Sequence, residues 1–338
     1  MKTERYREAG VDLALATEAK QRVLQALATT RTSLAYGDLG SFGGMVRVPD
    51  VEKPILVTST DGVGTKVLVA AEAGRHDTVG QDLVNHCVND ILVHGAKPFA
   101  FLDYIAAAAI DPNVTAALVE GVAHACRAHD MTLTGGETAE MPDLYHPGHY
   151  DLAGTIIGVV SENDVLGTER VESGDVLIGL SSNGLHTNGY TLARRIVFDQ
   201  LGLTVDSHVG VLGDTVANVL LQIHRSYADA LTHLLGDVHA MAHITGGGIP
   251  GNLVRALPRG LGARVNTTAW EVPSIFQFLQ DAGQVARDEM FDVFNMGIGM
   301  IVIVSRGKAD SVREAIIGAG VDAWLMGDVV NGEGVELV

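Results

Sequence analysis

Positive charge is scarce in this chain of 338 residues. Lys and Arg total 23 against 41 Asp and Glu, which gives a formal net charge of −18. A protein that neutralises nucleic-acid phosphates, or that docks on anionic lipid, needs a basic surface. We therefore expect no nucleic-acid partner and no membrane association. A few cations would still suffice to hold one small phosphorylated ligand.

Cysteine, aromatic residues and long apolar runs are also sparse. Cys87 and Cys126 are the two cysteines, too few for a disulfide framework or a four-ligand zinc site. No run approaches the ~18 apolar residues that span a bilayer, since Asp103 interrupts the stretch 99–110. The first eight residues contain no apolar stretch, so we expect no signal peptide and a cytoplasmic protein with two buried thiols.

Glycine and apolar residues are abundant, and their pattern predicts mixed secondary structure. There are 40 glycines, and 47% of the residues are hydrophobic. Apolar spacing predicts helices over 11–28, 78–94, 112–128 and 250–257, with another from about 190. Strands are predicted over 54–60, 98–106, 131–134, 151–160, 175–181, 240–244, 262–266, 296–304 and 323–330. The fold class is α/β or α+β, with two domains, 1–167 and 168–338, divided at a turn-rich patch.

The most specific local motif is the loop 60–66 (TDGVGTK), which follows an apolar strand. Two glycines, Gly62 and Gly64, let backbone N–H groups approach a ligand closely. Asp61 offers a hard oxygen for Mg²⁺, and Lys66 offers a charge for a phosphate. The alternative is an Asp-Gly turn followed by a surface lysine.

The predicted helix 78–94 has one apolar arc and one polar arc. The polar arc carries poor helix formers in place of the usual Glu and Lys, which favours a functional reason such as metal binding. A solvated face is the alternative. The residues of this arc are Asp82, Asn85, His86, Asn89 and Asp90.

Three further glycine loops carry polar groups. In the first, Gly135 and Gly136 precede Glu137 and Glu140, which would share a metal, orient a substrate or serve a local turn. In the second, 183–190, His186 is a candidate base or phosphate donor, although Asn188 also suits a helix cap. The third, Gly246, Gly247 and Gly248, matches G-x-G-x-x-G but lies too late in the chain for a dinucleotide fold, and a phosphate at a helix N-terminus is favoured.

The ordered set of motifs resembles the phosphoribosylformylglycinamidine cyclo-ligase (aminoimidazole ribonucleotide synthetase) family. The resemblance runs almost end to end, while no Walker A motif is present. The matching segments are 6–12 (YREAGVD), 40–44 (GSFGG), 60–66, 87–90 (CVND), 101–104 (FLDY), 135–142, 150–154 (YDLAG), 174–178 (GDVLI), 186–190 (HTNGY), 243–248 (HITGGG) and 294–300 (FNMGIGM).

The resemblance implies a homodimer in which N-terminal strands of two chains join in a barrel, followed by a C-terminal α/β domain. It also implies ATP, Mg²⁺ and formylglycinamidine ribonucleotide as ligands, with aminoimidazole ribonucleotide, ADP and phosphate as products. One departure is at Ile223-His224, where the family usually has Pro-Thr, so a substrate contact from that corner is in doubt. Met296 also replaces a residue that is commonly small or Cys, for which we expect only a packing consequence.

These implications assign roles to the candidate residues. The predicted metal ligands are Asp61, Asp90 and Glu137, supported by Asp82 and Asn89. Asp61, Lys66, Asp90 and His186 are the predicted catalytic residues. The nucleotide is expected at Gly62, Gly64, Thr65, Lys66, Gly135 and Gly136, under a closing loop that contains Gly40, Gly43 and Gly44. The ribonucleotide is expected at His186, Thr187 and Asn188, with its 5′-phosphate at Gly246, Gly247 and Gly248.

The expected chemistry is phosphorylation of the formyl amide oxygen by ATP, followed by attack of the amidine nitrogen and loss of phosphate. Two alternatives stay open. One is an ATP-dependent kinase or synthetase of the same superfamily that acts on another small molecule. The other is an acidic binding or regulatory protein that keeps the fold without catalysis.

Overall fold

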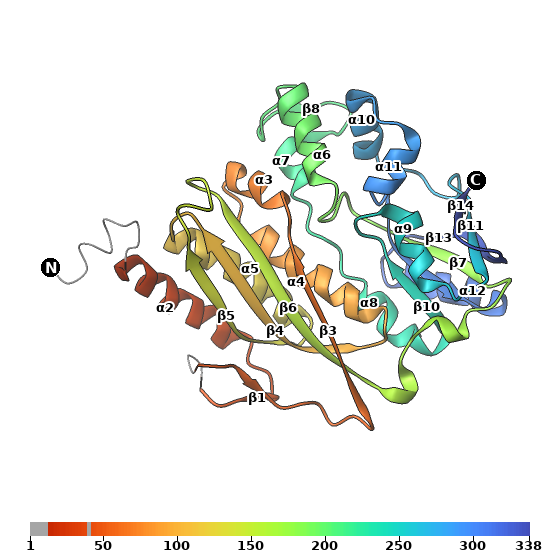
Figure 1. The fold of residues 1–338 in the computed structure, drawn as a ribbon, viewed down its shortest axis with the longest axis horizontal. Coiled ribbons are helices and arrows are strands. Elements are labelled where there is room, and N and C mark those ends of the chain that lie inside the picture. The colour runs from red at the N-terminus through yellow and green to blue at the C-terminus, as the bar shows by residue number, and fades with distance from the viewer. Residues whose placement is uncertain (1–12, 39–41) are drawn as a thin grey trace. The chain divides into compact units, whose positions relative to one another are not determined.

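The structure is a computed structural model that describes residues 13–38 and 42–338 (Figure 1). The chain forms two compact units. The first comprises residues 1–88 and 97–159, and the second comprises residues 89–96 and 160–338. The division falls inside helix α4 (Asp77–Leu92), so one helix supplies residues to both units. The predicted boundary after residue 167 stays a prediction, while by their contacts residues 160–167 belong with the second unit.

A four-stranded sheet organises the first unit, in the order β3-β6-β4-β5. Strands β4 and β5 are parallel, and β4 and β6 are antiparallel. A two-stranded β1–β2 ribbon lies apart from this sheet in the pairing. The strands are β1 (Ala35–Tyr36), β2 (Met45–Val46), β3 (Pro54–Gly62), β4 (Lys97–Ala107), β5 (Thr132–Glu140) and β6 (Tyr150–Ser161).

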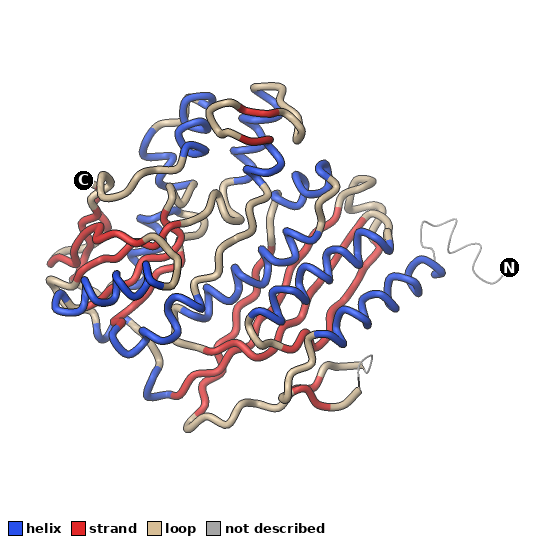
Figure 2. The backbone as a smooth tube through the Cα atoms, turned by 180° about the vertical axis from the view of Figure 1, so that it is seen from behind, coloured by secondary structure: helices blue, strands red, loops and turns tan. Residues whose placement is uncertain are grey.

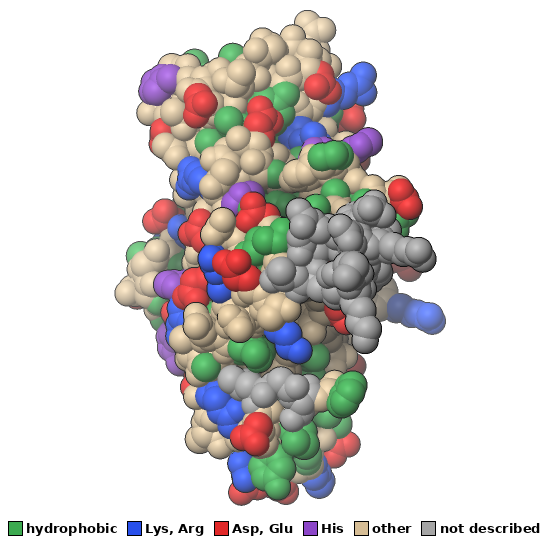
Figure 3. Space-filling model, turned by 90° about the vertical axis from the view of Figure 1, so that its left-hand side faces the viewer, with side chains coloured by type: hydrophobic (Ala, Val, Ile, Leu, Met, Phe, Trp, Pro, Cys, Tyr) green, Lys and Arg blue, Asp and Glu red, His purple; other side chains and the backbone are tan. Residues whose placement is uncertain are grey.

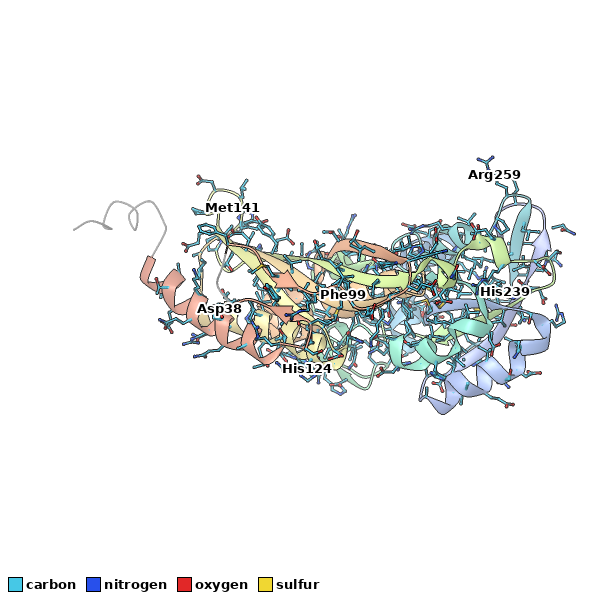
Figure 4. The ribbon with its side chains drawn as sticks, turned by 90° about the horizontal axis from the view of Figure 1, so that it is seen from below. Asp38, Phe99, His124, Met141, His239 and Arg259 are labelled. Atoms are coloured by element: carbon cyan, nitrogen blue, oxygen red, sulfur yellow. The ribbon has the colours of Figure 1, made fainter. Side chains whose placement is uncertain are left out.

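Helices cover one face of this sheet, as the view from behind shows (Figure 2). They are α2 (Leu13–Thr29), α3 (Lys66–Ala73), α4 and α5 (Pro112–Ala128). Helix α5 begins where Asp111 caps it: the Asp111 carboxylate accepts the N–H groups of Asn113 and Val114, and Pro112 occupies the first turn. Figure 4 labels Phe99 in the sheet and His124 on the helical side of it.

Two glycines let α4 and α5 approach backbone to backbone. A Cβ atom added to Gly80 would lie 2.3 Å from the carbonyl oxygen of Leu118, and one added to Gly121 would lie 2.1 Å from that of Asp77. Both distances are far below van der Waals contact, so any side chain at either position would force the helices apart.

The opposite face of the sheet is more open. On β3, Leu56, Thr58 and Thr60 are exposed, and on β6 half-buried residues such as Ala153 and Thr155 alternate with buried ones. The hydroxyl groups of Thr60 and Thr155 meet at 2.8 Å between these strands. In the side view of Figure 3, acidic and basic side chains are interspersed over the described surface of that face of the molecule.

A six-stranded, mostly antiparallel sheet organises the second unit, in the order β10-β12-β7-β13-β11-β14. Its strands are β7 (Val176–Ser181), β10 (Val238–His243), β11 (Leu261–Val265), β12 (Ile298–Val304), β13 (Ala323–Asn331) and β14 (Val335–Leu337). β11 and β14 are the parallel pair, and the central strands β7 and β12 are buried along their whole length. A separate two-stranded ribbon contains β8 (His208–Val209) and β9 (Asp214–Thr215).

Helices complete the second unit. They are α6 (Tyr190–Arg194), α7 (Val216–Leu220), α8 (Ala228–Leu231), α9 (Gly248–Leu253), α10 (Ser274–Gly283), α11 (Arg287–Val293) and α12 (Ala309–Gly318). The core packs β7 and β12 residues such as Ile178 and Val302 against Val312 and Ile316 of α12. In the described part of the chain, no helix combines the length and apolar character needed to cross a membrane.

Candidate active site

The loop after β3 places Asp61 at the edge of the first unit's sheet. Its Oδ1 atom accepts the N–H of Gly62 at 2.6 Å, and its Oδ2 atom lies 2.8 Å from Nε2 of His86 on α4. The Asp61 side chain is 40% exposed, so it keeps access to solvent ligands. Gly64 has φ +64°, a left-handed conformation that other residues rarely adopt, which explains the second glycine of the motif.

Lys66 and Asp82 form a fully buried ion pair, with 2.7 Å between Nζ and Oδ2. Burial lowers the pKa of Lys66, and the charge and hydrogen bond of Asp82 act in the opposite direction. Helix α3 begins at Lys66, and Thr65 makes no side-chain hydrogen bond to its first turn. The ammonium group is therefore engaged inside the unit, and the phosphate role of Lys66 and the metal role of Asp82 stay predictions.

The polar arc of α4 is not a solvated face. Asp82, His86 and Asn89 are buried, and Asn85 and Asp90 are partly buried. The alternative of a solvent-exposed polar stripe is therefore wrong. The poor helix formers are present because each makes a specific contact: for example, Asn85 Oδ1 lies 3.1 Å from Nε2 of His129.

The segment 135–140 was expected as a loop and is part of β5 instead. Gly136 is required there because a Cβ atom at this position would lie 1.8 Å from Oδ1 of Asp103. Glu137 is exposed, and its Oε1 atom accepts the N–H of Thr138. Glu140 is tied to the chain through its Oε1 atom, which accepts the N–H of Ile110 at 2.9 Å.

In the glycine loop 40–44, Gly40 lies outside the described residues. A Cβ atom at Gly44 would lie 2.2 Å from the carbonyl oxygen of Thr134, so this glycine permits a close approach to β5. Gly43 has open space around it. The structure thus gives Gly44 a packing reason, and the nucleotide contacts of all three glycines stay predictions.

Asp103 is a buried carboxyl group that the motif analysis did not single out. It lies on β4 between Gly136 of β5 and Gly154 of β6. Burial raises its pKa from 3.8 to about 7, partly offset by its own backbone N–H. Cys126 on α5 is also buried, and burial together with the Asp103 charge raises its thiol pKa. The signal was present in the sequence as one acid inside an apolar strand.

In the second unit, Asp90 and Asn89 are anchored by different groups. Oδ1 of Asp90 lies 2.8 Å from Nδ1 of His243, at the end of β10. Oδ1 of Asn89 accepts the N–H of Tyr227, and its Nδ2 donates to the carbonyl oxygen of Arg225. The Asp90 side chain is 24% exposed, whereas Asn89 is fully buried. Asn89 therefore serves the interior of this unit, and its supporting metal role stays a prediction.

His186 is held in a constrained loop. Its φ is +61°, and its Nε2 atom lies 3.1 Å from Oδ1 of Asn183. A Cβ atom at Gly299 would lie 2.5 Å from its ring and 2.0 Å from the hydroxyl of Tyr227. The imidazole is 2% exposed, so its candidate role as a base requires a ligand that reaches a nearly buried ring.

His224, the position that departs from the family pattern, lies beside this loop. Its ring stacks on His186, with centroids 4.0 Å apart and 23° between planes. Its Nδ1 atom is 3.3 Å from Oγ1 of Thr187, and its Nε2 atom is 3.2 Å from Nε2 of His243. Its Nε2 atom is also 3.2 Å from Nδ2 of Asn89. The structure therefore joins four residues that the motifs placed in separate stretches.

Asn188 and the triple-glycine loop are neighbours. A Cβ atom at Gly246 would lie 3.3 Å from Oδ1 of Asn188. The Nδ2 atom of Asn188 is buried, and no described residue hydrogen-bonds to it. Asn252 holds the loop through Nδ2, which donates to the carbonyl oxygens of Thr245, Gly246 and Gly248. Gly247 and Gly248 have φ of +95° and +58°, so this turn is built for glycine.

Sequence comparison places the chain among synthetase-related proteins. Residues 43–160 match the family "AIR synthase related protein, N-terminal domain", and residues 172–338 match its C-terminal counterpart. A phosphoribosylformylglycinamidine cyclo-ligase of Sorangium cellulosum is 46% identical over 96% of this chain and 95% of its own. One of Alkaliphilus metalliredigens is 43% identical over 97% and 95%.

Solved structures share the fold at low identity. Thiamine-monophosphate kinase from Stenotrophomonas maltophilia matches with a TM-score of 0.70 and 17% identity, over 96% of both chains. The hydrogenase maturation protein HypE in complex with ATP matches with a TM-score of 0.64 and 18% identity, over 92% of this chain and 86% of that one. Identity at this level shows a common architecture and no common substrate.

Proposed function

Because the chain belongs to the phosphoribosylformylglycinamidine cyclo-ligase family, we propose that it converts formylglycinamidine ribonucleotide and ATP to aminoimidazole ribonucleotide, ADP and phosphate. The observation that carries the proposal is the 46% identity over 96% of the chain, which includes every glycine-loop motif described above. Its place in metabolism is the ring-closing step of purine biosynthesis, in the cytoplasm. Two cysteines that are free and buried suit a reducing compartment.

The reaction activates an amide oxygen, which is a poor leaving group until it is phosphorylated. The γ-phosphoryl group passes from ATP to the formyl oxygen, and ADP leaves. The amidine nitrogen then forms a bond to the same carbon, the C–O bond breaks, phosphate departs and one proton is lost. Catalysis of the first step requires positioning and charge neutralisation more than covalent chemistry by the protein.

Divalent-metal binding is supported by the donor set. Asp61, Asp90 and Glu137 offer carboxylate oxygens, the ligands that Mg²⁺ prefers, and all three side chains keep some exposure. We keep these three as the ligands. Bound Mg²⁺ would neutralise charge on the phosphate oxygens. Asp82 fits less well, because its carboxylate pairs with Lys66 in the interior.

For the nucleotide, we propose backbone contacts at Gly62 and Gly64 and at the start of α3. The left-handed Gly64 and the helix start without a side-chain cap support this part of the proposal. Lys66 would act at a distance, by holding Asp82 and the first turn of α3 in place. The glycines 40, 43, 44, 135 and 136 complete the predicted nucleotide site.

For the ribonucleotide, we propose His186, Thr187 and Asn188, with the 5′-phosphate at Gly246–Gly248. The unpaired, buried Nδ2 of Asn188 beside Gly246 supports this assignment, because a buried donor without a partner costs ~1–3 kcal/mol unless a ligand accepts from it.

We also propose a homodimer that forms through the open face of the first unit's sheet. Exposed Leu56 and the threonines of β3, together with the half-buried alternate residues of β6, leave a partly apolar surface of the kind that protein interfaces cover. Sedimentation at several protein concentrations tests this directly: a monomer at concentrations far above those in the assay contradicts it.

The function is tested with purified protein, ATP, Mg²⁺ and formylglycinamidine ribonucleotide, while the aminoimidazole product and ADP are followed together. Product formation that depends on both substrates supports the proposal. ADP release with another acceptor but not with this ribonucleotide would instead favour a kinase or synthetase of the same superfamily. If the protein fails to bind Mg²⁺–ATP in calorimetry, the non-catalytic alternative is favoured.

Asp90→Asn tests the metal role. We expect a large loss of kcat with an unchanged melting temperature, since the amide is nearly isosteric but carries no charge. Near-normal turnover would remove Asp90 from the metal site.

A further inference from the structure

We propose that His224 is a positioning residue that links the Asp90–His243 pair to the substrate loop and fixes the direction of the Thr187 hydroxyl group. The proposal rests on the proposed function for the identity of the ligand. It concerns a residue that lies where the family pattern has Pro-Thr and that no motif assigned. All of the residues concerned belong to the second unit.

The first step is the state of His243. Its Nδ1 atom lies 2.8 Å from Oδ1 of Asp90, and a carboxylate can only accept, so Nδ1 carries the hydrogen. In the neutral ring this leaves Nε2 of His243 with a lone pair. That lone pair faces the ring of His224 at 3.2 Å.

The second step is the state of His224. Two lone pairs facing each other at 3.2 Å repel, so Nε2 of His224 donates its hydrogen to His243. Nδ1 of His224 is then an acceptor, and the group near it is Oγ1 of Thr187 at 3.3 Å. The amide of Asn89 is also near Nε2, but its orientation is already set by its bonds to Tyr227 and Arg225.

The consequence for Thr187 is directional. Its O–H points at Nδ1 of His224, so the oxygen lone pairs are turned away from that ring and remain available as acceptors. Such an oxygen recognises an N–H donor on the ligand, and the amidine of formylglycinamidine ribonucleotide carries such donors. A hydroxyl that could rotate freely would pay conformational entropy on binding.

The stacked rings add a second restraint. His224 is fully buried and lies 4.0 Å from His186, whose backbone is left-handed. Gly299 leaves room for His186 and Tyr227 on the other side. A threonine at position 224 would lack the ring and would be too short to contact Thr187 and His243 together, so histidine provides a link that the usual family residue does not.

Three variants separate these contacts. His224→Phe keeps a ring for stacking and removes both nitrogens. His224→Asn places an amide oxygen near the position of Nδ1 and can still accept from Thr187. His224→Gln places an amide N–H near the position of Nε2 and can still donate to His243. Val312→Ala, in the core of the same unit, controls for simple loss of stability.

The assay measures kcat and KM for ATP and for the ribonucleotide separately. We expect KM for the ribonucleotide to rise about tenfold in the Phe and Gln variants, as for the loss of one hydrogen bond, and less than about threefold in Asn. KM for ATP should stay within about twofold, and Val312→Ala should lower the melting temperature without changing either KM. Equal KM values in all three His224 variants, or an unchanged KM in the Phe variant, would overturn the proposal.

A measurement that needs no turnover keeps the inference separate from the proposed function. Nitrogen NMR of the wild-type protein, with the His224 signals assigned from their loss in the Phe variant, reports which ring nitrogen carries hydrogen. We expect hydrogen on Nε2 of His224 and on Nδ1 of His243. Hydrogen on Nδ1 of His224 would refute the network even in a fully active enzyme. If the expected pattern appears in a protein that does not use this ribonucleotide, the proposed function alone fails.

Discussion

Replacing Asp103 with Asn should stabilise the first unit, and the gain should depend on pH. The carboxyl group is buried between two glycine-containing strands, and its pKa is raised to about 7 in the folded chain, against 3.8 for an exposed Asp. Above both values the group is ionised in the folded and the unfolded chain, and ionised burial costs about 4 kcal/mol at ~1.4 kcal/mol per tenfold change in the ionisation constant. Asn is nearly isosteric and cannot ionise.

The sign of the pH dependence follows from proton uptake. Between about pH 4 and about pH 7 the folded chain binds more protons at Asp103 than the unfolded chain, so the wild type loses stability as pH rises through this window. Below it both states are protonated, and above it the cost is constant. The stability advantage of the Asn variant should therefore grow by about 2–3 kcal/mol between about pH 5 and about pH 8.

Urea unfolding at a series of pH values measures this advantage, with far-ultraviolet circular dichroism as the probe. Gly136→Ala is a steric comparison, because its methyl group would lie 1.8 Å from the Asp103 carboxylate. It should destabilise the protein at every pH. An Asn variant whose advantage is the same at all pH values, or which is less stable than wild type at about pH 8, would refute the account of Asp103.

Three other perturbations have expected outcomes. Lys66→Met should destabilise the protein by about 3–5 kcal/mol in urea unfolding, because Asp82 is left as an unpaired buried charge; adding Asp82→Leu should recover most of the loss, and no recovery would contradict the pair. Gly248→Ala should unfold or strongly destabilise the second unit, since its methyl group would lie 1.7 Å from a carbonyl oxygen, whereas Gly251→Ala on the same helix has open space and should be neutral or stabilising by up to ~1 kcal/mol by thermal melting. Gly299→Ala should displace the imidazole and phenol rings beside it and lower kcat/KM for the ribonucleotide at least about tenfold, and wild-type kinetics would refute that packing.

Regular elements were predictable where hydrophobic period and end signals agree. The helix predicted over 112–128 matches α5, because Asp111 and Pro112 mark its start and the apolar spacing is regular. Helix α3 was missed because its eight residues are too short and too uniformly apolar to show a period. The segment 135–140 was predicted as a loop because glycines usually break strands, whereas here Gly136 makes room for a side chain on the neighbouring strand.

The candidate site was predictable as a set of residue types but not as a set of contacts. Motif chemistry identified Asp61, Asp90 and His186, since acids and imidazoles in glycine loops stand out against an apolar chain. The burial of Lys66 was not predictable, because its partner lies on a different helix. The link through His224 was not predictable either, since its partners come from distant stretches of sequence and their meeting depends on how the second unit folds.

The two glycines at which α4 meets α5 bear on catalysis without touching a ligand. With peptide planes in contact, α4 cannot turn about its own axis unless the two helices separate, so the azimuth of every side chain on it is fixed by atoms that are missing. His86, the partner of Asp61, lies on this helix less than two turns after Gly80. A methyl group at either glycine would therefore misalign an acid–imidazole pair from a distance, and mutational scans that sample only polar residues would overlook it.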